Sequence, residues 1–150
     1  MSYQSLVYHI ILRTARSQRT ITEIYERELY RFLYGFMKEK KIDVFRIGGM
    51  PDHIHILASI PPSLAIAQVI GEMKRSSSIF MKNERHQFPY FEGWSKSYAV
   101  FSYAQRDKET ILNYIKHQKE HHQKHSLEDE LRKIFQEEAI SIDERFFLKD

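Results

Sequence analysis

Residues 52–57, Asp-His-Ile-His-Ile-Leu, place two histidines one residue apart inside an apolar run. Because successive side chains of an extended strand point to opposite faces, His53 and His55 would share one face, and the isoleucines that follow each of them would share the other. Such a strand packs against a core on one side and presents two imidazoles on the other. Neutral imidazole is the commonest metal ligand among protein side chains. The stretch therefore predicts either a metal clamp or two histidines on an ordinary strand face.

The bulk composition limits the classes of protein to which the chain can belong. Its 150 residues suffice for one domain with its own core, and a hydrophobic fraction of 42% excludes a disordered chain. The absence of cysteine from the sequence excludes disulfides and thiolate zinc sites. A net charge of +3 is compatible with a polyanionic partner but is too small to argue for nucleic acid alone. With neither a signal-peptide pattern nor a membrane-length apolar run, we expect no membrane partner and a cytoplasmic location.

Strand and helix patterns alternate along the chain. Strands are expected at 6–12, 42–47, 53–60 and 97–104, with a Gly-Gly-Met-Pro-Asp turn at 48–52. Helices are expected from a Thr20–Glu23 capping box to about residue 40, from Ser63 through Met73, at about 107–124, and at about 127–136 after Ser126. This order predicts a ferredoxin-like α+β fold, with a four-stranded antiparallel sheet and additional C-terminal helices. Neither a helix nor a strand is predicted for the tail after Ala139.

Tyr114 and Gln118 are four residues apart on the helix expected at 107–124 and would lie on one of its faces. In a ferredoxin-like fold the two crossover helices cover the sheet face that carries Ile54. The two histidines would occupy the opposite face, which the C-terminal helices are available to cover. A strand His-x-His followed by a helical Tyr-x-x-x-Gln is more specific than either motif alone.

Two other stretches carry groups suited to nucleic acid. Lys74, Arg75 and Ser76 offer cations and a hydroxyl for phosphate contacts, although they would equally suit an ordinary polar helix end. Trp94, in the aromatic loop 88–94, could stack on a base or close the edge of the core. His117 lies close to Tyr114 along the helix and could touch DNA. With Lys96, these six residues are the candidate nucleic-acid contacts.

In these features the chain resembles the single-tyrosine transposases of the insertion-sequence 200/605 type, within the HUH endonuclease superfamily. The resemblance runs from the first strand to Gln118 and rests on Pro51–Leu57, Pro61-Pro62, Met73–Ser77 and Trp94–Tyr98. It implies one HUH transposase domain over residues 1–150, which includes a tyrosine helix at 107–124 and a tail helix at 127–136.

The resemblance also implies a role for each residue of the site. His53, His55 and Gln118 would be metal ligands, and Tyr114 the nucleophile. It further implies a single-stranded DNA substrate with hairpins, and a homodimer whose active sites combine the histidines of one subunit with the tyrosine helix of the other.

The chemical nature of these groups indicates a metal-assisted attack of Tyr114 on a DNA phosphate. Two imidazoles and an amide oxygen form an incomplete ligand shell without protein charge, which would suit Mg²⁺ or Mn²⁺ and leave room for a phosphate oxygen. Tyr114 would displace a DNA 3′-oxygen, giving a 5′-phosphotyrosine and a free 3′-hydroxyl, and the reverse attack would rejoin strands. Because a free tyrosine has a pKa of about 10, Tyr114 needs activation, and the sequence identifies no base.

The sequence leaves other functions open. The same chemistry would serve a domesticated nuclease that processes palindromic repeats. A ferredoxin-like RNA-binding module without catalysis would stack bases on sheet aromatics, and the Tyr114–Gln118 pair weighs against it. Histidines at 117, 121, 122 and 125 have spacings that could hold a second metal, but ordinary solvated histidines are expected there.

Overall fold

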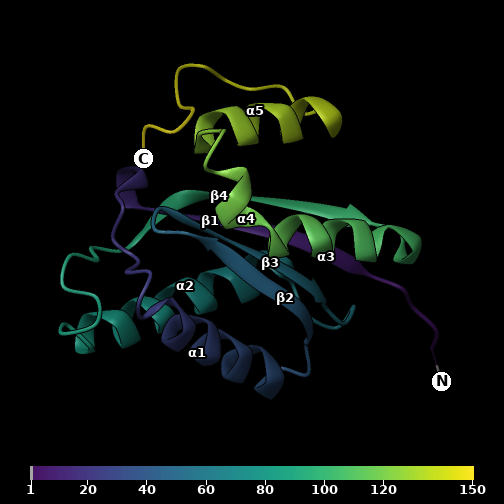
Figure 1. Ribbon diagram of the computed structural model, residues 1–150. Coiled ribbons are helices and arrows are strands. Elements are labelled where there is room, and N and C mark those ends of the chain that lie inside the picture. Colours follow the sequence, from purple (N-terminus) through teal and green to yellow (C-terminus); the bar gives the residue numbers. More distant parts are fainter. Residues whose placement is uncertain (1) are drawn as a thin grey trace.

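The computed structural model describes residues 2–150 as a four-stranded sheet with helices on both faces (Figure 1). The strands are β1 (Val7–Thr14), β2 (Asp43–Met50), β3 (His53–Ser59) and β4 (Trp94–Tyr103). Their order is β2-β3-β1-β4, and all neighbours are antiparallel. The helices are α1 (Glu26–Glu39), α2 (Ile66–Asn83), α3 (Lys108–Lys116), α4 (Gln118–His121) and α5 (Leu127–Glu137). The expected ferredoxin-like α+β fold with extra C-terminal helices is confirmed.

One face of the sheet carries the main hydrophobic core. Ile10 and Leu12 of β1 and Ile54 and Ile56 of β3 are buried there against α1 and α2. The two helices run side by side along this face (Figure 1). Burying each of these aliphatic side chains contributes about 1.5–3 kcal/mol, which fixes which face of β1 and β3 points inward.

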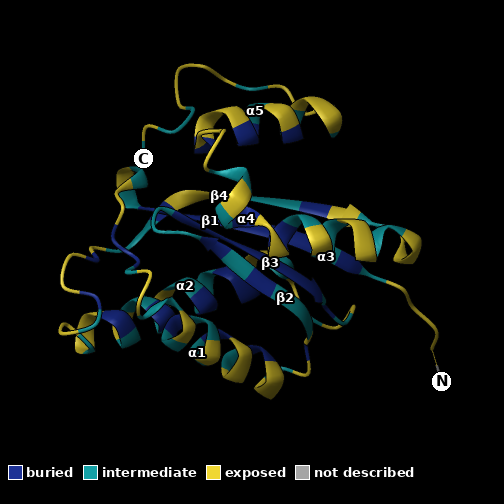
Figure 2. Ribbon diagram, viewed as in Figure 1, coloured by how far each residue is buried: buried dark blue, intermediate teal, exposed yellow. Residues whose placement is uncertain are grey.

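The alternate residues of the same strands point to the opposite face, which the C-terminal helices cover. Ile115 of α3 packs with Val7 and Leu57, while Leu131 of α5 packs with Ile11. Figure 2 shows the buried side of α5 turned toward the sheet and its exposed side turned away. The central strands are therefore buried on both faces, and polar groups on the second face lie in a covered layer.

The turn between β2 and β3 is shorter than predicted. Gly48 and Gly49 belong to β2, where they pair with His55 and Ile54, so the expected end of that strand at residue 47 is wrong. A Cβ atom on Gly48 would lie 2.9 Å from the carbonyl oxygen of Ile115. The glycine at position 48 thus allows α3 to approach the sheet closely.

The start of the first helix also differs from the prediction. The backbone N–H groups of Thr20 and Ile21 both donate to the carbonyl of Pro51, at 3.0 and 2.9 Å. Because these amides are tied to the β2–β3 turn, the Thr20–Glu23 capping box is wrong and α1 begins at Glu26. Similarly, α2 begins at Ile66 instead of directly after Ser63, and β4 begins at Trp94, three residues before the expected position 97.

The helix expected at 107–124 is broken at His117, whose φ and ψ of −101° and 23° separate α3 from α4. The last helix begins as predicted, and the Ser126 hydroxyl accepts a hydrogen bond from the Asp129 N–H at 3.1 Å. Beyond α5 the chain returns across the sheet and ends beside Arg13 (Figure 1). Within residues 2–150, no helix is both long enough and apolar enough to cross a membrane.

Candidate active site

His53 and His55 are fully buried on the sheet face that the C-terminal helices cover. One nitrogen of each ring is held by a neighbour: His53 Nδ1 lies 2.7 Å from Asp52 Oδ1, and His55 Nδ1 lies 2.7 Å from His9 Nε2. Such contacts fix the orientation of an imidazole and leave its other nitrogen free to act as a ligand. Both Nε2 atoms are directed toward the layer between the sheet and α5, where they lie near Glu130.

Gln118, the first residue of α4, reaches the same place. Its Oε1 atom lies 3.1 Å from His53 Nε2, and the side chain is buried. The adjacent Lys119 anchors α4, because its ammonium group donates to the carbonyl of Gly49 at 2.6 Å. The structure thus brings all three residues predicted as metal ligands, His53, His55 and Gln118, to the same place beside Glu130.

Glu130 of α5 is a functional candidate that sequence reasoning missed. Its Oε1 atom lies 3.1 Å from His53 Nε2, 3.3 Å from His55 Nε2 and 3.0 Å from His122 Nε2. Glu130 lies among the buried apolar positions of α5, three residues after Leu127 and four before Ile134. A single charged residue in an apolar helical stripe is a signal that could have identified it.

The donor atoms fit a divalent cation. Octahedral ligands about 2.1 Å from an ion lie about 3.0 Å apart when they are adjacent to one another. The separations of 3.1, 3.3 and 3.1 Å among His53, His55, Glu130 and Gln118 match that spacing. His53, His55 and Glu130 accordingly form a group that could hold a metal ion. A second group, His121, His122 and Glu130, shares the same carboxylate.

Tyr114 of α3 adjoins this group. Its hydroxyl donates a hydrogen bond to Glu130 Oε2, which also accepts one from Gln118 Nε2 at 2.7 Å. Burial and the negative charge of Glu130 raise the pKa of Tyr114 far above its usual value. Burial would also raise the pKa of Glu130, but His55, His122 and His53 together hold it well below the usual range. The phenol therefore keeps its proton beside an ionised carboxylate.

The pKa values of the three buried histidines are shifted in different directions. Burial alone would lower the pKa of His53, but its hydrogen bonds with the carboxylates of Asp52 and Glu130 raise it to about 9. Burial lowers the pKa of His55, and burial together with the nearby His55 lowers that of His9. In the absence of a metal, His53 is therefore the protonated member of the group at neutral pH.

His9 is a second residue that the sequence did not single out. It lies on β1, and its ring stacks on that of His55 with centroids 5.0 Å apart. The side chain is buried, and its Nδ1 atom finds no hydrogen-bond partner within residues 2–150. Its contact with His55 Nδ1 makes it a positioning residue for that imidazole.

The candidate nucleic-acid residues fall in separate places. The Lys74 ammonium donates to the carbonyl of Lys96 at 2.9 Å and lies over the Tyr98 ring, so α2 and β4 present these lysines together. Arg75 and His117 are exposed, and Ser76 is half-buried. The Nδ1 atom of His117 lies 2.7 Å from the Asn113 carbonyl oxygen. Trp94 packs against the main core and donates to the Ser77 hydroxyl at 2.9 Å, as expected of an aromatic that closes the core edge.

Residues 2–118 match the family described as "Transposase IS200 like". The chain belongs to this family. Relatives include the transposase for insertion sequence element IS200 from Salmonella typhimurium, which is 25% identical over 117 residues, covering 75% of this chain and 76% of the relative. The ISDra2 transposase TnpA from Deinococcus radiodurans is 24% identical over 117 residues, covering 75% of this chain and 84% of the relative. The family match ends at Gln118, so Glu130 lies outside it.

Solved structures of similar fold support the architecture of this IS200-like family member. A crystal structure assigned as a transposase from Deinococcus radiodurans R1 superposes with a TM-score of 0.59 at 22% identity, covering 79% of this chain and 95% of the other. A REP-associated tyrosine transposase bound to a REP hairpin superposes with a TM-score of 0.60 at 10% identity, covering 81% of this chain and 74% of the other. The transposase activity class comes from the family and its relatives, and the structural neighbours share the fold.

Proposed function

We propose that this transposase cleaves and rejoins single-stranded DNA through a 5′-phosphotyrosine at Tyr114. The observation that carries the proposal is the meeting of four side chains at one carboxylate. Glu130 accepts hydrogen bonds from Tyr114 and Gln118 on one oxygen, while its other oxygen lies beside His53 and His55. A nucleophile and a set of metal-binding groups within contact of each other are the two requirements for a metal-assisted transesterification.

The proposed cofactor is Mg²⁺ or Mn²⁺, held by His53, His55, Gln118 and Glu130. The sequence predicted a ligand set without protein charge, and Glu130 adds a carboxylate, which increases the preference for these hard cations. When bound, such an ion polarises a phosphate oxygen and offsets negative charge at the reacting group.

The protein side chains supply position and direction. The Tyr114 oxygen attacks phosphorus and the bond to the DNA 3′-oxygen breaks, so that the proton lost by the phenol ends, in net terms, on the departing 3′-hydroxyl. Attack by a 3′-hydroxyl on the tyrosyl phosphate reverses the step and returns a proton to Tyr114. Glu130 Oε2 holds the Tyr114 hydroxyl by a hydrogen bond and so sets its direction. Because the pKa of Glu130 is so low, we assign it a positioning role and not that of a strong base.

The proposed DNA partner is a single strand that carries a hairpin, a proposal that the hairpin bound to the REP-associated neighbour supports by analogy. We retain a homodimer as a proposal. Within the single chain, the Tyr114 ring lies beside its own His55, which supports cleavage within one subunit as the alternative to exchange of helices between subunits. Mixing inactive Tyr114→Phe with inactive His55→Ala protein separates the two arrangements, because only exchanged helices would restore activity.

The deciding experiment is formation of a denaturation-resistant adduct with an end-labelled, hairpin-bearing single strand in Mn²⁺. The unmodified protein and a Tyr90→Phe control, changed at an exposed tyrosine, should both form the adduct. Tyr114→Phe should bind the strand without forming the adduct, and EDTA should abolish the adduct in the unmodified protein and in the Tyr90→Phe control. An adduct on Tyr114→Phe would show that another residue is the nucleophile.

A further inference from the structure

Arg13 is a buried cation on the same sheet face as the candidate active site. It pairs with His53 across β1 and β3, and Cα atoms of such pairs lie about 5 Å apart. Its side chain is 5% exposed. A buried guanidinium requires an anionic or hydrogen-bonding partner, because an unpaired buried charge is strongly destabilising.

The anionic partner of Arg13 is Asp150, the last residue of the sequence, and the guanidinium also donates to the hydroxyls of Ser17 at 2.9 Å and Ser97 at 3.3 Å. The guanidinium forms an ion pair with the Asp150 carboxylate and donates to its backbone oxygen at 2.9 Å. The same carboxylate accepts hydrogen bonds from the Ser97 N–H at 2.7 Å and from the Ser97 hydroxyl at 3.1 Å. A guanidinium, a backbone N–H and a hydroxyl that converge on one anion form a site equally suited to a phosphate.

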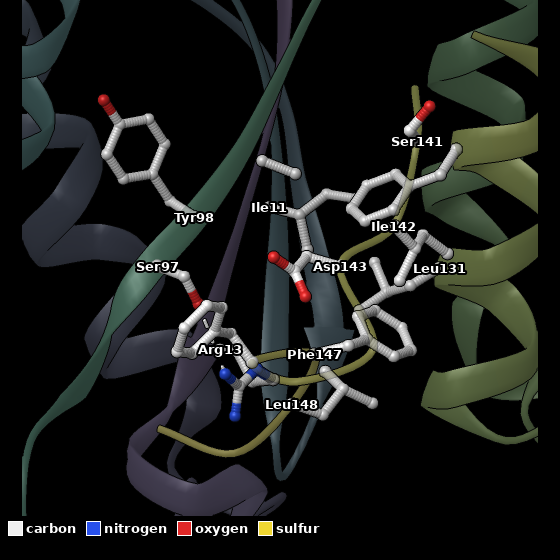
Figure 3. A pocket seen from close by; sticks show the side chains of 13 residues that line it. Ile11, Arg13, Ser97, Tyr98, Leu131, Ser141, Ile142, Asp143, Phe147 and Leu148 are labelled. Carbon is white, nitrogen blue, oxygen red and sulfur yellow. Dashed lines mark hydrogen bonds between the residues drawn. The ribbon is translucent and has the colours of Figure 1, made fainter. Parts of the chain in front are cut away.

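The segment that carries Asp150 is held by side-chain packing and by its last residue: Phe147 and Leu148 pack beside Ile11 and Leu131, and the Asp150 backbone oxygen accepts a hydrogen bond from the Arg16 N–H at 2.8 Å. Residues 140–150 contain turns but neither helix nor strand. A cavity of about 250 Å³ lies among this segment, α5 and the sheet; its lining includes Ile11, Arg13, Ala99, Leu131, Phe135 and Phe147 (Figure 3). The bidentate ion pair between Glu144 and Arg132 is exposed and contributes little. The segment can therefore detach at much lower cost than the strands beneath it.

The surroundings of the Arg13 site also suit a nucleic-acid backbone. Lys74 lies within electrostatic reach of Arg13 and Asp150, which shift its pKa in opposite directions, while burial is the main cause of its lowered value. Lys74 in turn contacts Lys96 at the β4 edge. Cationic groups thus run from the strand beside His53 around the β4 edge to α2, which lies on the opposite side of the sheet.

We propose that Arg13 and Ser97 bind a backbone phosphate of the DNA strand adjacent to the phosphate that is cleaved, and that Asp150 occupies this site when DNA is absent. The proposal rests on the proposed function, since it assumes that DNA enters over this face. Binding of the strand replaces one anion on Arg13 by another and releases the 140–150 segment.

This competition predicts opposite effects for the two partners of one ion pair. Loss of the Asp150 charge frees the phosphate site, whereas loss of Arg13 removes it. A purely structural ion pair would give both changes the same sign, because each would destabilise the same contact.

The test measures binding of a fluorescent single-stranded oligonucleotide to the full chain in a Tyr114→Phe background, so that covalent chemistry plays no part. Asp150→Asn should tighten binding at least about threefold more than Glu144→Gln, a matched loss of one carboxylate charge on the same segment. Arg13→Gln should weaken binding and reduce the salt slope by about one. The proposal would be overturned if Asp150→Asn bound the oligonucleotide no more tightly than Glu144→Gln. It would also be overturned if Arg13→Gln left the salt dependence of binding unchanged.

Hydrogen exchange provides a readout that does not depend on these variants. Amides in residues 140–150 should exchange faster when the oligonucleotide binds, and unchanged or slower exchange would contradict release of the segment. If Arg13→Gln does not fold, the Asp150 comparison and the exchange measurement decide the question. Adduct formation at Tyr114 in the unmodified protein is measured separately, so failure of the phosphate site can be told from failure of the proposed function.

Discussion

The Tyr114 hydroxyl donates a hydrogen bond to the Glu130 carboxylate, although only Tyr114 lies within the residues that match the transposase family. The two side chains come from α3 and α5, which are separated by α4 and a turn. The position of the proposed nucleophile therefore depends on a helix outside the family match. Changes that loosen α5 should affect cleavage as well as stability.

Glu130→Gln tests this dependence, because it keeps the shape of the side chain and removes its charge. We expect Mn²⁺ affinity to fall at least about tenfold, since the site loses its anionic ligand. The pKa of Tyr114 should also fall, because the charge of Glu130 helps to raise it. Calorimetry and ultraviolet titration of the phenol measure the two effects. Glu137→Gln, on an exposed position of the same helix, is the control for the metal affinity, and equal metal affinities for both variants would exclude Glu130 as a ligand.

Metal binding should release a proton from His53. This imidazole has a pKa raised to about 9, so it is protonated at neutral pH and must lose its proton to act as a ligand. Metal affinity should therefore rise with pH below 9, by about tenfold per unit if one proton is displaced. Calorimetry at pH 7.5 in buffers of different ionisation enthalpy counts the protons released, and a count near zero would mean that His53 is not a ligand.

Gly48→Ala should displace α3. The new Cβ would lie 2.9 Å from the Ile115 carbonyl oxygen, so the helix that carries Tyr114 must move away from β2. We expect a loss of about 1–3 kcal/mol in unfolding free energy, as for other overpacked sites, together with a lower adduct yield. Gly71→Ala is the control, since a Cβ there meets none of the described atoms within 4 Å and should stabilise α2 by about 0.5–1 kcal/mol. Equal stability of the two variants in denaturant unfolding would contradict the close approach.

Ser126→Ala should weaken the start of α5. The serine hydroxyl caps the helix by accepting from the Asp129 N–H, and loss of such a cap costs about 1 kcal/mol. Faster amide exchange is expected in the first turn of α5, which leads directly into Glu130. Ser141→Ala, on an exposed position after α5, should leave that exchange unchanged. Identical exchange in both variants would show that the cap does not hold the helix.

The features predicted correctly from the sequence follow from local patterns. Alternation along β3 placed His53 and His55 on one face and Ile54 on the other, because strand periodicity depends on neighbouring residues alone. Helical spacing placed Tyr114 and Gln118 together, and both reach Glu130 despite the break at His117.

The features that were missed depend on contacts distant in sequence. The capping box failed because the amides of Thr20 and Ile21 bond to Pro51 instead. Glu130 meets His55 across 75 positions of the chain, and Arg13 meets Asp150 across 137. A local pattern can mark such residues as unusual, but it does not identify their partners.

The alternation of β1 and β3 also determines where the chain can accept an added residue. Arg13 and His53 lie on one face of these strands, and Leu12 and Ile54 lie on the other. One extra residue in the middle of either strand would rotate every later side chain by half a turn, exchanging site residues with core residues. Viable length variants of this chain should therefore be confined to its loops, and the two central strands should keep a constant number of residues.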